Sequence, residues 1–244
     1  MRYNFNSELE QDYISDIQHM YDVIENKSVF EIALGNSARM TPIYNNYSIK
    51  SLFGIEPFEL WYNQSKDILE RYAEFDWKIL CSSYEDYTPD DFDIVVCNGL
   101  AYHLHSPYHL FEYLANINAE YIIMETTGVL DEGDETPNID RIKQSIQDSS
   151  FDDYIMTKSQ MFSTYEQHNT PGNRINSKRS IPWNNSGLNP DIIVLAFWCM
   201  GYDLDKCHER VGGGGDKSKQ CNTVYRFRKS EDYTRDPRTL GEQK

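Results

Sequence analysis

The chain has 244 residues, of which 23 are lysine or arginine and 39 are aspartate or glutamate, so its formal net charge is −16. An acidic surface of this kind repels nucleic acid and anionic membrane, so an anionic partner would need a local basic patch. Hydrophobic residues make up 39% of the chain and aromatic residues 14%. This apolar content excludes a disordered acidic chain, and no apolar run approaches the roughly 18 residues of a membrane helix.

The cysteines and the start of the chain indicate the compartment. The five cysteines are scattered and form no Cys-x-x-Cys pair, which argues against a disulfide framework and against a zinc knuckle. The polar, acidic segment from Met1 to Gln11 lacks the pattern of a secretory signal. We therefore expect a reduced, cytoplasmic protein with one sizeable core.

Hydrophobic periodicity predicts helices that alternate with short apolar strands. A capping box at Ser7 opens an amphipathic helix that is expected to end near Lys27. The predicted elements that follow are a strand at 29–34, a helix at 38–47, a strand at 49–55, a helix at 58–75, strands at 77–81 and 92–97, a helix from 106 and a strand at 121–124. Such alternation is typical of a parallel α/β sheet with both faces covered.

The remainder of the chain predicts an insertion and a hairpin. Residues 129–188 are rich in Asp, Ser, Asn and Gln, and we expect this segment to be a lid over a site. A helix from Asn189 to Gly201 and strands at 202–211 and 221–229, joined through four glycines, predict an antiparallel hairpin. The expected organisation is an N-terminal helix at 1–27, a core domain at 28–229 that carries the lid, and a polar tail at 230–244.

Two features at strand ends predict a ligand site. The turn after the first predicted strand, residues 31–38, contains the small residues Ala33, Gly35, Ser37 and Ala38. In doubly wound sheets ligands bind outside the carboxyl ends of the strands, where the backbone must approach the ligand closely. Glu56, about 20 positions beyond the glycine, is placed to bind the two hydroxyls of a ribose. The alternatives are a turn without a ligand and an acid that stabilises a helix start.

The segment after the fourth predicted strand carries a third pattern, Asn98-Gly99-Leu100-Ala101-Tyr102-His103-Leu104. Here the chain resembles the class I S-adenosylmethionine-dependent methyltransferases, among them members with a Gly-x-x-Tyr-His-Leu run. Some of those modify tRNA and others act on small metabolites. The resemblance covers the order of elements from about residue 28 to 229. The first motif of the family, an acidic residue followed by Gly-x-Gly-x-Gly, stands here as Glu31, Ala33, Gly35 and Ser37.

The resemblance implies a Rossmann-like, doubly wound, mostly parallel seven-stranded sheet with an antiparallel C-terminal hairpin strand. It also implies S-adenosylmethionine as cofactor. Glu31 and Gly35 would shape the pocket for its methionine part, Glu56 would hold the ribose, and a serine pair would lie beside the adenine. The residues implied in cofactor binding are Glu31, Ala33, Gly35, Ser37, Glu56, Ser82, Ser83, Asn98 and Gly99.

Methyl transfer needs little acid–base chemistry, because the methyl group is already activated on a sulfonium and catalysis is mostly positioning and exclusion of water. Where the acceptor must lose a proton, His103 is the nearest candidate base, with Tyr102 beside it. A packed or helix-capping histidine is the alternative. His103, His105 and His109 follow no standard zinc spacing, so we expect no metal.

The predicted lid contains the candidate acceptor residues. Arg174 and Arg179 belong to a cationic run without acids, which suits a phosphate or carboxylate, and Trp183 suits a planar group. A solvated loop is the alternative. We therefore expect methyl transfer to a small-molecule or polar acceptor. The competing hypotheses are a nicotinamide-dependent oxidoreductase, a non-catalytic S-adenosylmethionine-binding protein on the same scaffold, and a nucleic-acid acceptor, which the charge disfavours.

Overall fold

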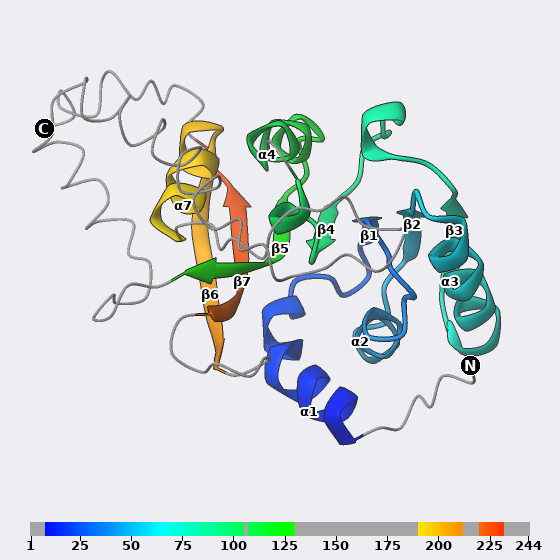
Figure 1. The fold of residues 1–244 in the computed structure, drawn as a ribbon. Coiled ribbons are helices and arrows are strands. Elements are labelled where there is room, and N and C mark those ends of the chain that lie inside the picture. Colours follow the sequence, from blue (N-terminus) through cyan, green and yellow to red (C-terminus); the bar gives the residue numbers. More distant parts are fainter. Residues whose placement is uncertain (1–7, 105–106, 130–189, 212–219, 232–244) are drawn as a thin grey trace, which may run out of the picture. The chain divides into compact units, whose positions relative to one another are not determined.

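The computed structural model describes residues 8–104, 107–129, 190–211 and 220–231. Its elements are shown in Figure 1. In chain order they are α1 (Glu8–Ile17), the 3-10 helix η1 (Gln18–Tyr21), β1 (Ser28–Ile32), α2 (Met40–Asn46), β2 (Ser51–Ile55), α3 (Glu59–Tyr72), β3 (Asp76–Leu80), η2 (Tyr84–Asp86), β4 (Ile94–Asn98), η3 (Ala101–His103), α4 (Pro107–Asn116), β5 (Tyr121–Val129), α7 (Pro190–Cys199), β6 (Tyr202–Val211) and β7 (Gln220–Lys229).

The strands form one seven-stranded sheet in the order β3-β2-β1-β4-β5-β7-β6. β1 pairs in parallel with β2 and with β4, β2 pairs in parallel with β3, and β6 is antiparallel to β7. The predicted α/β fold, with a mostly parallel sheet and an antiparallel C-terminal hairpin, is confirmed. The strand order changes direction between β1 and β4, and such a switch point is where doubly wound sheets bind ligands.

Several predicted boundaries were wrong. The N-terminal helix, expected to run to Lys27, is an α-helix only to Ile17 and continues as η1. Tyr47 Oη donates to the carbonyl oxygen of Gln18 at 2.9 Å, so a distant side chain satisfies a carbonyl at this end of the helix. β1 ends at Ile32 instead of position 34, because Ala33 adopts a left-handed backbone. β5 runs to Val129, five residues beyond the predicted strand at 121–124, so the first residue of the predicted lid is part of the sheet. The rest of the predicted lid and most of the predicted tail lie outside the described residues.

Contacts divide the chain into two compact units, of which the first comprises Met1–Asn98 and Ile117–Met124. In this unit the connection from β3 to β4, residues 81–93, contains η2 and no α-helix. Instead, four aromatic rings cover one face of β1 and β2. Ring centroids are 5.1 Å apart for the stacked pairs Phe53–Tyr87 and Phe30–Phe92. This cluster replaces the helix that usually packs on a parallel strand pair.

The second unit comprises Gly99–Asn116 and Glu125–Lys244, and its described core is centred on Phe197 of α7. The Phe197 ring stacks on Phe227 of β7 at 4.3 Å and lies 5.2 Å from Phe111 of α4. Phe111, Phe197 and Phe227 are fully buried. Side chains of this size contribute roughly 1.5–3 kcal/mol each on burial, so the aromatic contacts hold the two helices and the hairpin together.

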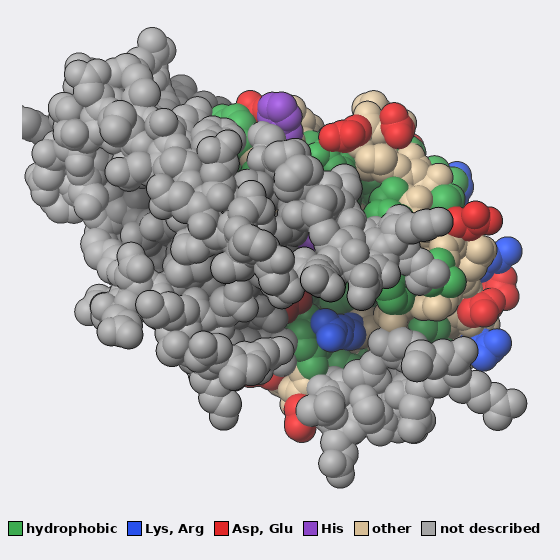
Figure 2. All heavy atoms as spheres, viewed as in Figure 1, with side chains coloured by type: hydrophobic (Ala, Val, Ile, Leu, Met, Phe, Trp, Pro, Cys, Tyr) green, Lys and Arg blue, Asp and Glu red, His purple; other side chains and the backbone are tan. Residues whose placement is uncertain are grey.

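Charged and apolar side chains are interspersed over the described part of the face drawn in Figure 2, without a continuous basic surface. This distribution agrees with the net charge of −16. Among the described helices, none is long and apolar enough to cross a membrane.

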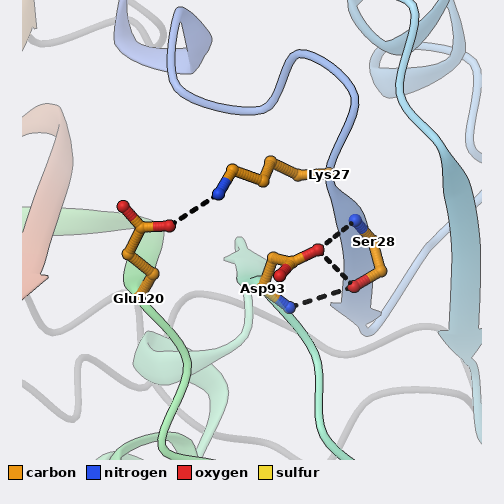
Figure 3. Close-up of polar contacts among 4 residues, drawn as sticks. All are labelled: Lys27, Ser28, Asp93 and Glu120. Atoms are coloured by element: carbon orange, nitrogen blue, oxygen red, sulfur yellow. Dashed lines mark hydrogen bonds and ion pairs between the residues drawn. The ribbon is translucent and has the colours of Figure 1, made fainter.

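Two polar contacts lie where β1, β4 and β5 begin (Figure 3). Asp93 accepts hydrogen bonds through Oδ2 from the backbone N of Ser28 at 2.8 Å and from its Oγ at 2.7 Å. Lys27 pairs with Glu120 at 2.8 Å. Burial alone would raise the pKa of Asp93, but the hydrogen bonds from Ser28 and the charges of Lys27 and Lys50 together outweigh burial and hold that pKa below its ordinary value.

These two contacts should contribute unequally to the free energy of unfolding. Asp93→Ala leaves a part-buried N–H group without its acceptor, so we expect urea denaturation to show a loss of about 2 kcal/mol. Glu120→Gln breaks an ion pair whose side chains are 36% and 49% exposed, and should cost less than about 1 kcal/mol. Because its folded-state pKa is depressed, Asp93 stabilises the fold at neutral pH and loses this effect on acidification. Equal losses in the two variants would contradict this account.

Candidate functional site

The loop that follows β1 adopts a left-handed backbone at alternate residues. The φ angles are 58° at Ala33, 58° at Gly35 and 55° at Ser37. These are the three positions at which the resemblance places glycines. A left-handed conformation costs a residue with a side chain roughly 1–2 kcal/mol, so Ala33 and Ser37 carry backbone strain. The glycine motif is therefore retained as a backbone conformation, although two of its glycines are replaced.

Hydrogen bonds hold this strained loop in place. The backbone N of Ala33 donates to the carbonyl oxygen of Ile55 at the end of β2, at 2.9 Å. The Ser37 hydroxyl donates to Oγ of Ser65 at 2.9 Å, and Ser65 donates to the carbonyl oxygen of Gly35 at 2.8 Å. Ser65 belongs to α3 and is fully buried. The serine in the third glycine position thus ties the loop to α3, which a glycine could not do.

A close approach between Leu34 and Gly54 also shapes the loop. A Cβ atom on Gly54 would lie only 2.5 Å from Cδ1 and 2.9 Å from Cγ of Leu34. Gly54 is a residue of β2, and its missing side chain lets Leu34 pack directly on the strand. Glycine inside a strand often marks such an approach, so Gly54 is the sequence signal that could have predicted this packing.

Glu56 lies immediately after β2 and is only 2% exposed. Its Oε2 accepts from the backbone N of Gly35 at 2.9 Å, and its Oε1 accepts from the backbone N of Phe58 at 3.0 Å. Burial raises the pKa of Glu56, and these two hydrogen bonds offset part of the rise. One carboxylate therefore joins the loop after β1 to the start of α3.

Glu31 of β1 is also 2% exposed, and Tyr44 Oη of α2 donates to its Oε2 at 2.9 Å. Burial raises the pKa of Glu31 to about 8; the Tyr44 hydrogen bond opposes this rise, and the charge of Glu56 adds to it. The carboxyl group of Glu31 is therefore largely protonated near neutral pH. Tyr44 was not identified by sequence reasoning.

Asn98 ends β4, and its amide nitrogen contacts side chains of two distant elements. Nδ2 donates to Tyr21 Oη of η1 at 2.9 Å and to Met40 Sδ of α2 at 3.2 Å. These residues are distant in sequence from Asn98, so no local pattern could have predicted the contacts.

The serine pair after β3 makes local contacts. Ser83 Oγ accepts from the backbone N of Glu85 at 3.3 Å and so caps η2, while Ser82 Oγ donates to the carbonyl oxygen of Ser83 at 3.1 Å.

Among the predicted site residues of the first unit, hydrogen bonds connect Gly35 with Glu56 directly and with Ser37 through Ser65 of α3.

The second unit holds three further predicted site residues. Gly99 has a φ of 75°, and its backbone N donates to the carbonyl oxygen of Glu125 at 2.9 Å. Tyr102 and His103 belong to η3. The His103 side chain is exposed, yet neighbouring protein displaces enough water to lower its pKa below the ordinary value. Its imidazole is therefore mainly neutral at neutral pH.

The predicted acceptor residues Arg174, Arg179 and Trp183 lie outside the described residues. In the parts of the chain that are described, no group of three or more His, Cys, Asp or Glu side chains is arranged to hold a metal ion.

Comparisons with known proteins identify the fold. No family model and no curated protein sequence matches the chain. A magnesium protoporphyrin IX methyltransferase from Synechocystis PCC 6803 with bound S-adenosylmethionine matches with a TM-score of 0.54 and 10% identity, over 91% of this chain and 80% of that one. A putative sarcosine dimethylglycine methyltransferase from Galdieria sulphuraria matches with a TM-score of 0.58 and 9% identity, over 92% and 85%.

A third solved structure, the N-terminal domain of EvdMO1 with bound S-adenosylhomocysteine, matches with a TM-score of 0.55 and 18% identity, over 91% of this chain and 82% of that one. At these identities the likeness concerns the fold. The chain therefore has the fold of the S-adenosylmethionine-dependent methyltransferases.

Proposed function

We propose that the chain is a cytoplasmic S-adenosylmethionine-dependent methyltransferase that acts on a small-molecule acceptor. The observation that carries the proposal is the hydrogen bond from the backbone N of Gly35 to Oε2 of Glu56. It joins the loop expected to hold the methionine part of the cofactor to the acid expected to hold its ribose. The fold and the resemblance of Glu31, Ala33, Gly35 and Ser37 to the first motif support the same assignment.

The chemistry of Glu56 suits a ribose. Each of its carboxylate oxygens accepts one backbone hydrogen bond, from Gly35 or from Phe58. A carboxylate oxygen has two lone pairs, so each oxygen can accept one further bond from a ribose hydroxyl. The two backbone bonds would hold the carboxylate in place before the cofactor arrives, which reduces the entropy lost on binding.

The remaining cofactor residues follow the family pattern. Glu31 would lie near the positively charged methionine part, where a cationic neighbour would favour the ionised form of its buried carboxyl group. Gly99 and Asn98 would flank the methionine tail, and Ser82 and Ser83 would contact the adenine edge through their backbone groups, because the Ser83 hydroxyl already caps η2.

When bound, S-adenosylmethionine supplies a methyl group already activated on a sulfonium. The chain then has to hold the acceptor in line with that group and exclude water. His103 would take the proton of an acceptor that must lose one, and its lowered pKa leaves the imidazole neutral and ready to accept it. Tyr102 would lie beside the reacting groups. Arg174, Arg179 and Trp183 would bind a planar or anionic acceptor.

A small acceptor agrees with the charge of the chain. The net charge of −16 opposes binding to a nucleic-acid backbone. The face drawn in Figure 2 offers no continuous basic surface on its described part. A small anionic molecule needs only one or two cationic side chains, which the predicted lid contains.

Thermal unfolding with added ligands tests this proposal. A ligand at about 100 times its Kd stabilises the native state by about 2.7 kcal/mol, which should raise Tm by roughly 5–10 °C in a chain of this size. We expect S-adenosylmethionine and S-adenosylhomocysteine to produce this rise and NADH to produce none. The reverse result would identify a nicotinamide-dependent enzyme. Release of S-adenosylhomocysteine across an acceptor screen then separates a methyltransferase from a non-catalytic binding protein.

A further inference from the structure

The side chain of Asn98 is held by two residues that belong to no recognised motif. Tyr21 lies in η1, before the sheet begins, and is fully buried; Met40 is the first residue of α2 and is 4% exposed. Asn98 Nδ2 is 2.9 Å from Tyr21 Oη and 3.2 Å from Met40 Sδ. An amide nitrogen has two hydrogens, so it can donate to both partners at once.

The sulfur of Met40 determines which way the amide is turned. A thioether sulfur accepts hydrogen bonds weakly and donates none. The amide atom facing it must therefore be the nitrogen, since a carbonyl oxygen there would set two acceptors against each other. Met40 thus disfavours the reversed orientation of the amide, and the hydrogen bond to the Tyr21 hydroxyl adds to the hold on the amide nitrogen. The carbonyl oxygen of Asn98 lies on the other branch of the same planar group.

We propose that Tyr21 and Met40 are positioning residues that turn the Asn98 carbonyl oxygen toward the amino group of the cofactor. This inference rests on the proposed function, which places Asn98 beside the methionine tail. That tail ends in an ammonium group, which only donates hydrogen bonds, and in a carboxylate, which only accepts them. An asparagine that presents its oxygen matches the ammonium, and one that presents its nitrogen does not.

Tyr21 of η1 and Met40 of α2 would then act on cofactor binding through Asn98, although neither would touch the cofactor. It also predicts a selective effect. Loss of either contact weakens the preference for this orientation of the amide, so the chain should lose affinity for ligands with the ammonium group and keep its affinity for ligands without it.

Isothermal titration of the full chain with two probes tests this selectivity. S-adenosylhomocysteine carries the amino-acid tail, and 5′-methylthioadenosine has the same adenosine and thioether without it. We expect Tyr21→Phe and Met40→Leu each to weaken S-adenosylhomocysteine binding about tenfold and to leave methylthioadenosine binding unchanged. Met40→Leu nearly conserves side-chain volume. Tyr47→Phe is the matched control, because it also removes a phenol oxygen bound to η1, at Gln18, and should change neither affinity.

The outcomes separate this inference from the proposed function. If Tyr21→Phe and Met40→Leu weaken both probes equally, or weaken neither, the positioning role is wrong and the proposed function stands. If Tyr47→Phe shows the same selective loss, the effect arises from η1 as a whole and the role of the amide is wrong. If the unmodified chain binds neither probe, the proposed function fails and this inference fails with it.

Discussion

Replacing Glu56 by alanine is expected to weaken S-adenosylhomocysteine binding by about 100-fold or more. The change removes the proposed acceptor of two ribose hydroxyls, and hydrogen bonds to a charged group contribute about 1.5–3 kcal/mol each. It also releases the backbone N of Gly35 and of Phe58, which the carboxylate now holds. Since 2.7 kcal/mol corresponds to about 100-fold in Kd, loss of the two ribose bonds alone accounts for the effect.

Isothermal titration of folded Glu56→Ala protein measures this loss, and Glu59→Ala is its control. Glu59 is an exposed residue at the start of α3, three positions away, so its replacement removes the same charge without touching the loop. We expect Glu59→Ala to bind as the unmodified chain does. A change below about threefold in Glu56→Ala, or an equal loss in both variants, would remove Glu56 from the cofactor site.

Replacing Glu31 by glutamine should change how stability depends on pH. The pKa of Glu31 is raised from 4.5 to about 8, chiefly by burial. Between these values the unfolded chain releases a proton that the native state keeps, so this group makes the native state progressively less stable as pH rises. Glutamine keeps an acceptor for the Tyr44 hydroxyl and has no proton to release. Near pH 8 the variant should therefore exceed the unmodified chain in stability by a few kcal/mol.

Urea denaturation at a series of pH values measures this difference. The two proteins should have similar unfolding free energies near pH 5 and diverge as the pH approaches 8. Glu74→Gln, at an exposed glutamate, should leave the pH profile unchanged. A constant offset between Glu31→Gln and the unmodified chain at every pH would show that Glu31 is ionised in the native state.

The fold was predictable because its strands are short apolar runs separated by clear helices. Val29 to Ile32 and Ile94 to Cys97 are buried strands that the sequence locates within about two residues. The prediction that the loop after β1 and Glu56 belong to one site came from their spacing, and a hydrogen bond joins Gly35 to Glu56 in the structure. The functional role of these residues stays a prediction.

The partners of the site residues could not be predicted, because each contact joins elements that are distant along the chain. Tyr21 and Asn98 are 77 positions apart, and Ser37 and Ser65 are 28 apart. Hydrophobic periodicity reports which face of one element is buried and carries no information about its polar partners. The hydrogen bond at the end of α1 is of the same kind, since Tyr47 reaches Gln18 across 29 positions.

A crystal structure of the chain with bound S-adenosylhomocysteine would show whether Glu56 and the loop after β1 form one cofactor site. We expect both ribose hydroxyls to donate to Glu56 and the methionine tail to lie along residues 31–37. A ribose bound elsewhere, or a tail that does not reach the loop after β1, would contradict it.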